Sequence, residues 1–299
     1  MYVTTDRNKD QVLRAMTIDA SFRVITAITS NTVGEIVHRQ NPPTSEVEHL
    51  GELVAGTILV RETMSPNLRV QGILRGAKST GTLVADSHPD GSARGLVSIL
   101  HGAASLDMGD GATLTMMRSL PGGRNHQGIV ALKNTTLGKA LRRSSQVSDA
   151  LMSYMDESEQ VRSMIDVSCV IRDNNVLVAG GYIVQLLPEL KESQLMIMTE
   201  RLTEFPSMAS LLSSGHEAAH VLNELLYGMP YSLLSDSPLR FECKCSHMGV
   251  IACLATLNSD EIKRLISEGE PPTISCEFCG AEYSVTIEQL HELLKGILN

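Results

Sequence analysis

The sequence predicts an α+β fold in three parts: an N-terminal domain of mixed helices and sheet over residues 1–188, a helical linker over 189–240 and a small C-terminal domain over 241–299. Three observations support this division. Short apolar runs bounded by Gly, Pro or Asp alternate with helix-like segments up to residue 188. Prolines and glycines then interrupt a helix-prone stretch. Five of the six cysteines follow residue 240.

Strand signals dominate the first part. Apolar stretches of strand length, separated by turn residues, predict strands at Phe22–Ile28, Val33–Val37, Leu68–Leu74, Gly81–Asp86, Gly95–Leu100, Ala112–Met117 and Gly128–Ala131. A last hairpin is expected between Cys169–Ile171 and Val176–Val184. Its turn would be Asp173-Asn174-Asn175, because Asp and Asn tolerate the left-handed backbone of tight turns.

Two helices are expected between these strands. Thr44 follows a Pro-Pro breaker and precedes acidic residues, so it is a suitable N-cap for a helix that runs to about Met64. The end of this helix, Gly56–Val60, also suits a strand. A second helix is predicted from Ser144 to Met164 because apolar residues recur there at helical spacing.

The segment 189–240 differs from both neighbours. It is helix-prone but broken by Pro206, Ser213-Ser214-Gly215, Pro230 and Pro238. These breaks predict a loosely packed linker that lies outside the first core.

Composition excludes several classes of protein. The net charge is -9, with 25 Lys and Arg against 34 Asp and Glu, whereas nucleic-acid binding needs a basic face. No apolar run approaches the roughly 20 residues of a membrane helix. The N-terminus, MYVTTDRNKD, lacks the layout of a secretion signal. We therefore expect a cytoplasmic protein without nucleic-acid or membrane partners, whose thiols stay reduced.

Four cysteines form the most specific motif. Cys243-Lys-Cys245 is followed, after thirty residues, by Cys276-Glu-Phe-Cys279-Gly280. Two close thiol pairs brought together by a folded segment are typical of a tetrahedral zinc site. The sequence therefore predicts one Zn2+ per chain, bound by Cys243, Cys245, Cys276 and Cys279 in the reduced form.

Such a site is also a possible redox sensor. A small domain with little core depends on its metal for folding, and zinc-bound thiolates are the species that oxidants attack. Oxidation to disulfides would release zinc and unfold the domain. On the residues alone, a permanent structural zinc remains the alternative.

The motif His216-Glu217-Ala-Ala-His220 suggests a zinc protease, because on a helix it places two imidazoles and a glutamate together. No third ligand is evident, so we interpret the motif as a polar helix face and expect no enzyme.

Cys169 and Cys253 have no close partner. Both have apolar sequence neighbours and are expected to pack as small hydrophobic residues.

Four further blocks of the sequence are distinctive when taken together and in this order: Tyr154 with Ser158-Glu159-Gln160, Gly180-Gly181 with Gln185 and Pro188, Phe241-Glu-Cys-Lys-Cys-Ser246, and Cys276-Glu-Phe-Cys279-Gly-Ala-Glu-Tyr283. Through these blocks the chain resembles the redox-regulated 33-kDa heat-shock chaperones over nearly its whole length. One block departs from the family. After the first cysteine pair the family usually has Ser-x-Glu-Arg, whereas this chain has Ser246-His247-Met248-Gly249.

The resemblance implies an α+β N-terminal domain, a metastable linker and a zinc-binding C-terminal domain. It implies an inactive reduced form. Oxidation would then pair Cys243 with Cys245 and Cys276 with Cys279, release zinc and unfold the linker. The product would be an ATP-independent holdase, a homodimer when oxidised, that binds unfolded client proteins under oxidative or heat stress. The alternative functions are a non-catalytic binding module with a permanent structural zinc and, more remotely, the zinc protease.

Overall fold

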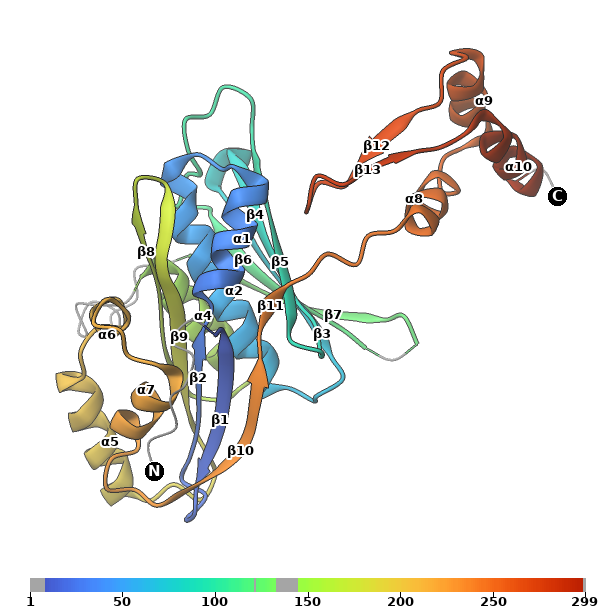
Figure 1. Cartoon of the computed structure of the whole chain (residues 1–299). Coiled ribbons are helices and arrows are strands. Elements are labelled where there is room, and N and C mark those ends of the chain that lie inside the picture. Colours follow the sequence, from blue (N-terminus) through green and yellow to red (C-terminus); the bar gives the residue numbers. More distant parts are fainter. Residues whose placement is uncertain (1–8, 121, 133–144, 298–299) are drawn as a thin grey trace. The chain divides into compact units, whose positions relative to one another are not determined.

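The computed structural model describes residues 9–120, 122–132 and 145–297 of the chain (Figure 1). It consists of two compact units, Met1–Glu242 and Cys243–Asn299. Within the described residues, no helix has both the length and the apolar character that crossing a membrane requires. Each unit is described by itself below.

Two sheets form the framework of the first unit. The first sheet has the strand order β10-β1-β2-β9-β8 and is antiparallel throughout. The second sheet has the order β11-β5-β4-β3-β6-β7, in which only the β11–β5 pair is parallel. The strands are β1 Gln11–Thr17, β2 Phe22–Ile28, β3 Arg69–Arg75, β4 Gly81–Ser87, β5 Ser92–Ile99, β6 Thr113–Ser119, β7 Asn125–Ala131, β8 Ser163–Arg172, β9 Asn175–Leu186, β10 Tyr231–Pro238 and β11 Arg240–Phe241.

Helix α2, Thr44–Thr63, is the central element of this unit. It contacts strands of both sheets, and nearly every residue from Glu46 to Glu62 is buried. A helix that is apolar on all sides must be surrounded by protein, which explains its Leu, Val, Ile and Ala content. The helical reading of Gly56–Val60 is therefore confirmed. Helix α1, Ser30–Gln40, and helix α4, Gln146–Glu157, pack beside it, and a short 3-10 turn covers Ala77–Ser79.

Both faces of the first sheet contribute to a core, and successive side chains along a strand point alternately to the two cores. Ile25 and Ile183 face a large core around α2, whereas Val24 and Val184 face a second core. That second core is covered by α5 Glu192–Glu204, α6 Met208–Ser213 and α7 Ala218–Leu225. Its buried residues include Phe22, Met208, Leu211, Val221, Leu222 and Leu225.

The helices of the segment 189–240 are thus packed onto the first sheet rather than loosely attached. Buried hydrogen bonds support this packing. The Thr26 hydroxyl donates to the Ala218 carbonyl at 2.9 Å, and the Asp166 carboxylate accepts from the Met208 N–H at 2.9 Å. The last part of the segment is not helical: Tyr231–Pro238 forms β10, which pairs with β1. Pro230 and Pro238 fall at the ends of this edge strand, where a missing N–H costs little.

Two other predictions are wrong in part. Val33–Val37 was expected as a strand but lies in α1, where Val33, Ile36 and Val37 share one buried face. The helix predicted to reach Met164 ends at Glu157. The Tyr154 hydroxyl donates to the Glu159 carboxylate at 2.5 Å, and Gln160 adopts a φ of 57°, which a helix cannot continue. Its predicted first residue, Ser144, lies outside the described residues.

The remaining strand predictions are confirmed within a few residues, including the hairpin of β8 and β9. Its turn has left-handed φ angles at Asp173 and Asn174, of 49° and 62°. Gly180 and Gly181 lie in β9 where neighbouring strands approach closely. A Cβ there would come within 2.4 Å of the Ala27 carbonyl and 2.7 Å of the Asp166 carbonyl, so only glycine fits.

The second unit is small. It contains α8 His247–Leu254, α9 Ser259–Ser267, the hairpin of β12 Thr273–Ser275 and β13 Glu282–Ser284, and α10 Ile287–Ile297. A capping box of Asn258 and Glu261 starts α9. The core of the second unit is formed by the buried side chains of Leu254, Ile262, Val285 and Leu290.

Candidate metal centre

The four predicted cysteines converge in the second unit. Their sulfur atoms all lie within 4.8 Å of one another. The Sγ atoms of Cys243 and Cys276 are 3.7 Å apart, and those of Cys245 and Cys279 are 3.4 Å apart. A tetrahedral ion with metal–sulfur bonds of about 2.3 Å needs sulfurs about 3.8 Å apart. The arrangement can therefore hold one metal ion.

The second cysteine pair is positioned by the β12–β13 turn. The Cys276 N–H donates to the Ala281 carbonyl at 2.8 Å, and the Gly280 N–H donates to the Cys276 carbonyl at 2.8 Å. Gly280 has a φ of 72°, which a residue with a side chain rarely adopts. This turn holds the Cys276 and Cys279 thiols on the same side.

The first pair leads into α8. Cys243 and Cys245 lie in the extended segment between β11 and α8, and Ser246 caps that helix by accepting a hydrogen bond from the Gly249 N–H at 3.1 Å. The departure at 246–249 thus keeps its capping serine. His247 contacts β13, with its Nε2 atom 3.2 Å from the Ser284 carbonyl oxygen.

The electrostatics of the cluster favour a bound cation. Burial and hydrogen bonds with the other thiols raise the pKa of Cys279 to about 12, and burial also raises the pKa of Cys276. Four sulfurs this close cannot all ionise unless a positive charge lies between them. A divalent metal ion supplies that charge and deprotonates the thiols that bind it.

One further residue contacts the cluster. The Tyr283 hydroxyl donates a hydrogen bond to the Cys245 sulfur at 3.1 Å, and this bond raises the pKa of Tyr283 to about 12. Sequence reasoning identified Tyr283 only as part of a family motif. Ile274, two residues before Cys276, pairs with Tyr283 in the β12–β13 ladder, and no signal in the sequence marks this register.

The two remaining cysteines lie outside this cluster. Cys169 is buried beside α2, as predicted, and burial raises the pKa of its thiol to about 12, so it is unreactive. The prediction for Cys253 is wrong, because its side chain is exposed. On α8 the neighbouring Leu254 faces the core, and adjacent helix residues do not share a face.

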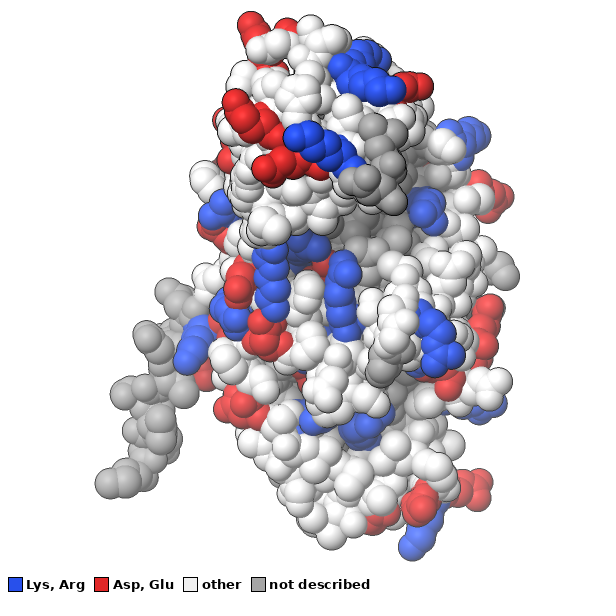
Figure 2. Space-filling view, turned by 90° about the vertical axis from the view of Figure 1, so that its right-hand side faces the viewer, with Lys and Arg blue, Asp and Glu red and all other residues white. Residues whose placement is uncertain are grey.

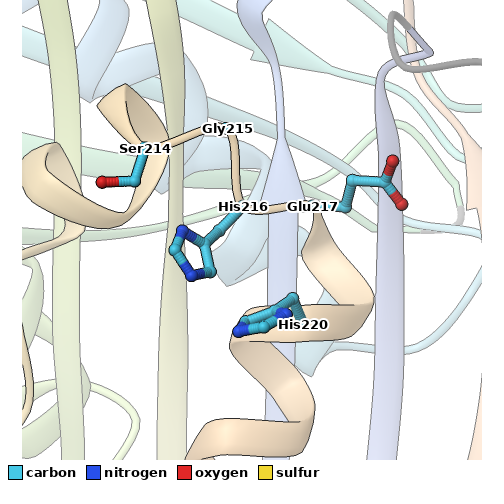
Figure 3. A pocket seen from close by; sticks show the side chains of 5 residues that line it. All are labelled: Ser214, Gly215, His216, Glu217 and His220. Atoms are coloured by element: carbon cyan, nitrogen blue, oxygen red, sulfur yellow. The ribbon is translucent and has the colours of Figure 1, made fainter.

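The H-E-x-x-H residues do not adopt a protease arrangement. Glu217 is the N-cap of α7, so His216 precedes the helix. The imidazole rings of His216 and His220 contact each other at 4.2 Å between centroids and line a hollow of about 440 Å³. Figure 3 shows the Glu217 carboxylate pointing away from both rings. Among the described residues, this motif does not provide three converging metal ligands.

The surface carries charges of both signs. On the face shown in Figure 2, Lys and Arg side chains are interspersed with Asp and Glu, and uncharged areas separate them.

The fold and the cysteine cluster together define an α+β protein with four cysteines in a small second unit that could hold a metal ion. A family model described as Hsp33 protein matches residues 10–286. The chain belongs to this Hsp33 chaperone family, as the resemblance implied.

Individual comparisons agree with the family assignment. The chain is 31% identical over 289 residues to the 33 kDa chaperonin of Syntrophotalea carbinolica, with 96% of this chain and 99% of the relative covered. It is 26% identical over 294 residues to that of Geobacter sulfurreducens, covering 95% and 94% of the two chains. The crystal structure of the 33 kDa chaperonin from Thermotoga maritima has the same fold, with a TM-score of 0.81 at 20% identity over 97% of this chain and 99% of the other.

Proposed function

We propose that the protein is a redox-regulated, ATP-independent holdase that is inactive when reduced and zinc-bound. Zinc loss on oxidation activates it by unfolding the second unit and the segment 189–240. The observation that carries this proposal is the convergence of four cysteine sulfurs in a unit with almost no other core. Membership of the Hsp33 chaperone family supports unfolded proteins as the partners.

Zinc is the metal that the donor set favours. Four thiolates at tetrahedral spacing suit Zn2+, which has no redox chemistry of its own and prefers sulfur and nitrogen ligands. The ligands would be Cys243, Cys245, Cys276 and Cys279. When bound, the ion supplies folding free energy and keeps the four thiols ionised.

The energetic argument follows from the size of the second unit. Structural zinc contributes on the order of 10–16 kcal/mol in comparable small sites, whereas a whole domain is stable by only about 5–15 kcal/mol. Among the described residues of this unit, the buried apolar side chains of its core are Leu254, Ile262, Val285 and Leu290. Loss of the ion should therefore unfold it.

Peroxide supplies the oxidising chemistry. Each peroxide takes two electrons from one thiolate sulfur, which gains an oxygen atom as a sulfenic acid while water leaves. A second thiol then attacks that sulfur, a disulfide forms and another water leaves. Two peroxides and four protons thus convert four zinc-bound thiolates into two disulfides, four waters and free Zn2+.

We propose the pairs Cys243–Cys245 and Cys276–Cys279, as the family resemblance implies. The shortest sulfur contacts in the structure run instead between the pairs, from Cys243 to Cys276 and from Cys245 to Cys279. Once zinc leaves, however, the fold that holds the two pairs together is lost. Cysteines two or three residues apart in sequence stay close in an unfolded chain, so disulfides within each pair form more readily than disulfides between the pairs.

The path from the metal centre to the segment 189–240 is covalent and short. Cys243 comes two residues after the end of β11. Within this strand, the Arg240 guanidinium donates a hydrogen bond to the Asp90 carbonyl at 2.8 Å. The preceding β10 is an edge strand with Leu233 and Leu234 exposed. We propose that unfolding spreads from Cys243 through β11 and β10 to α7, uncovering the second core for unfolded clients and for a second subunit.

Zinc binding tests the ligand assignment. We expect one tightly bound zinc per reduced chain and none after Cys276→Ser with Cys279→Ser, because two thiolates cannot complete the site. His216→Ala with His220→Ala is the matched control and should keep the full zinc content. Metal analysis of the purified reduced proteins measures both. Zinc retained in the cysteine variant, or lost from the histidine variant, would refute the assignment.

Aggregation of a thermally unfolding client, followed by light scattering, tests the switch. Reduced protein should leave aggregation unchanged. Protein treated with peroxide under mild heat should suppress it without ATP and release its zinc to a chromogenic chelator, and dithiothreitol with zinc should reverse both effects. Equal suppression by the two forms would instead support a binding module with a permanent structural zinc.

A further inference from the structure

The Tyr283 hydroxyl is a side-chain group outside the cysteines that donates a hydrogen bond to a sulfur of the cluster. Its oxygen lies 3.1 Å from Cys245 Sγ. Tyr283 is held by pairing with Ile274 in the β12–β13 ladder, and its ring lies 6.5 Å from the His247 ring, between centroids. The hydroxyl is therefore fixed against the sulfur from the hairpin that also carries Cys276 and Cys279.

A thiolate can only accept in this contact, so the tyrosine O–H is the donor. A donor aimed at a metal-bound thiolate withdraws electron density from the sulfur, and hydrogen bonds to charged acceptors are stronger than neutral ones. Oxidants and alkylating agents attack the sulfur through that same electron density. A hydrogen-bonded sulfur therefore reacts more slowly than the same sulfur without the bond.

We propose that Tyr283 is a positioning residue that protects the Cys245 sulfur and so sets how readily the metal centre is oxidised. This role rests on the proposed redox function but concerns a residue outside the ligand set. Other sulfurs of the cluster accept hydrogen bonds from backbone N–H groups, those of Phe278 and Ala281 among them. The backbone donors are built into the turn, whereas the Tyr283 donor can be removed by one substitution that leaves the aromatic ring in place.

The test compares Tyr283→Phe with the wild type, both loaded with zinc. Removing one hydrogen bond of ordinary strength should make peroxide-driven zinc release about three- to tenfold faster. Alkylation by N-ethylmaleimide without peroxide, located by mass spectrometry, should rise by a similar factor at Cys245 alone. Tyr231→Phe is the matched control, because its hydroxyl also donates a hydrogen bond, to Asn223 Oδ1 at 2.6 Å, away from the cysteines. It should leave both rates unchanged.

Three results would overturn the proposal. The first is an unchanged release rate in Tyr283→Phe with unchanged labelling of Cys245. The second is labelling that rises equally at all four cysteines, which indicates a loosened fold. The third is loss of zinc from the variant before oxidant is added, which would show that Tyr283 contributes to the affinity for zinc rather than to the rate of oxidation. If the wild type releases no zinc to peroxide, the redox function fails, while the labelling experiment still decides the role of Tyr283.

Discussion

Removing zinc from the reduced protein is expected to unfold residues 243–297, and with them the segment 189–240, while the central strands of the two sheets in the first unit stay folded. The metal contributes on the order of 10–16 kcal/mol, more than the small core around Ile262 and Leu290 can replace. Amide hydrogen exchange after chelation should show α8, α9 and α10 exchanging as an unfolded chain. Central strands such as β3 and β4, which lie inside the second sheet, should keep their slow exchange.

The Cys276→Ser, Cys279→Ser variant provides the internal control. It should exchange rapidly over the same residues before any chelator is added, and chelation should then change nothing further. Slow exchange of residues 243–297 in the metal-free wild type would mean that the unit folds without its ion. In that event zinc loss could not by itself start the unfolding that the switch requires.

The convergence of the four cysteines could be predicted from the sequence because they form two close pairs and are chemically distinctive. Cys243 and Cys245 are separated by one residue, Cys276 and Cys279 by two, and few arrangements other than a zinc site use such pairs. The hydrogen bond from Tyr283 to Cys245 could not be predicted in the same way. It depends on the register of a hairpin with three-residue strands, and tyrosine is an ordinary strand residue.

Strands β3 to β7 of the second sheet were also predictable, since each is bounded by turn residues, whereas β11 was not predicted. The segment 189–240 was harder, because its prolines indicate interruption but not what the interrupted pieces contact. The pieces pack on the face of the first sheet that presents Val24 and Val184, and β10 pairs with a strand more than two hundred residues away. Pairing over such a separation leaves no local pattern. Val33–Val37 was misassigned because β-branched residues favour strands unless tertiary packing selects a helix.

The position of α7 makes the switch testable without touching the metal. Leu222 lies on α7 with 2% of its surface exposed, within the second core and facing strands β1 and β2. Leu222→Asp would bury an unpaired carboxylate there, which costs several kcal/mol, enough to release a short helix from the sheet. We expect this variant to suppress client aggregation in its reduced form as strongly as oxidised wild type, and to keep one zinc per chain.

Ala219→Asp is the matched control, because it adds the same side chain on the exposed face of α7 and should leave the reduced protein inactive. Hydrogen exchange reports whether α7 is released, and metal analysis reports whether the second unit stays intact. Should Leu222→Asp unfold the whole first unit, Leu222→Ala gives a milder loss of about 2–5 kcal/mol and a correspondingly partial activation. A variant with α7 released, zinc bound and no chaperone activity would show that the second core is not the surface that zinc controls. Activity in that state would mean that zinc inhibits by keeping these helices on the sheet.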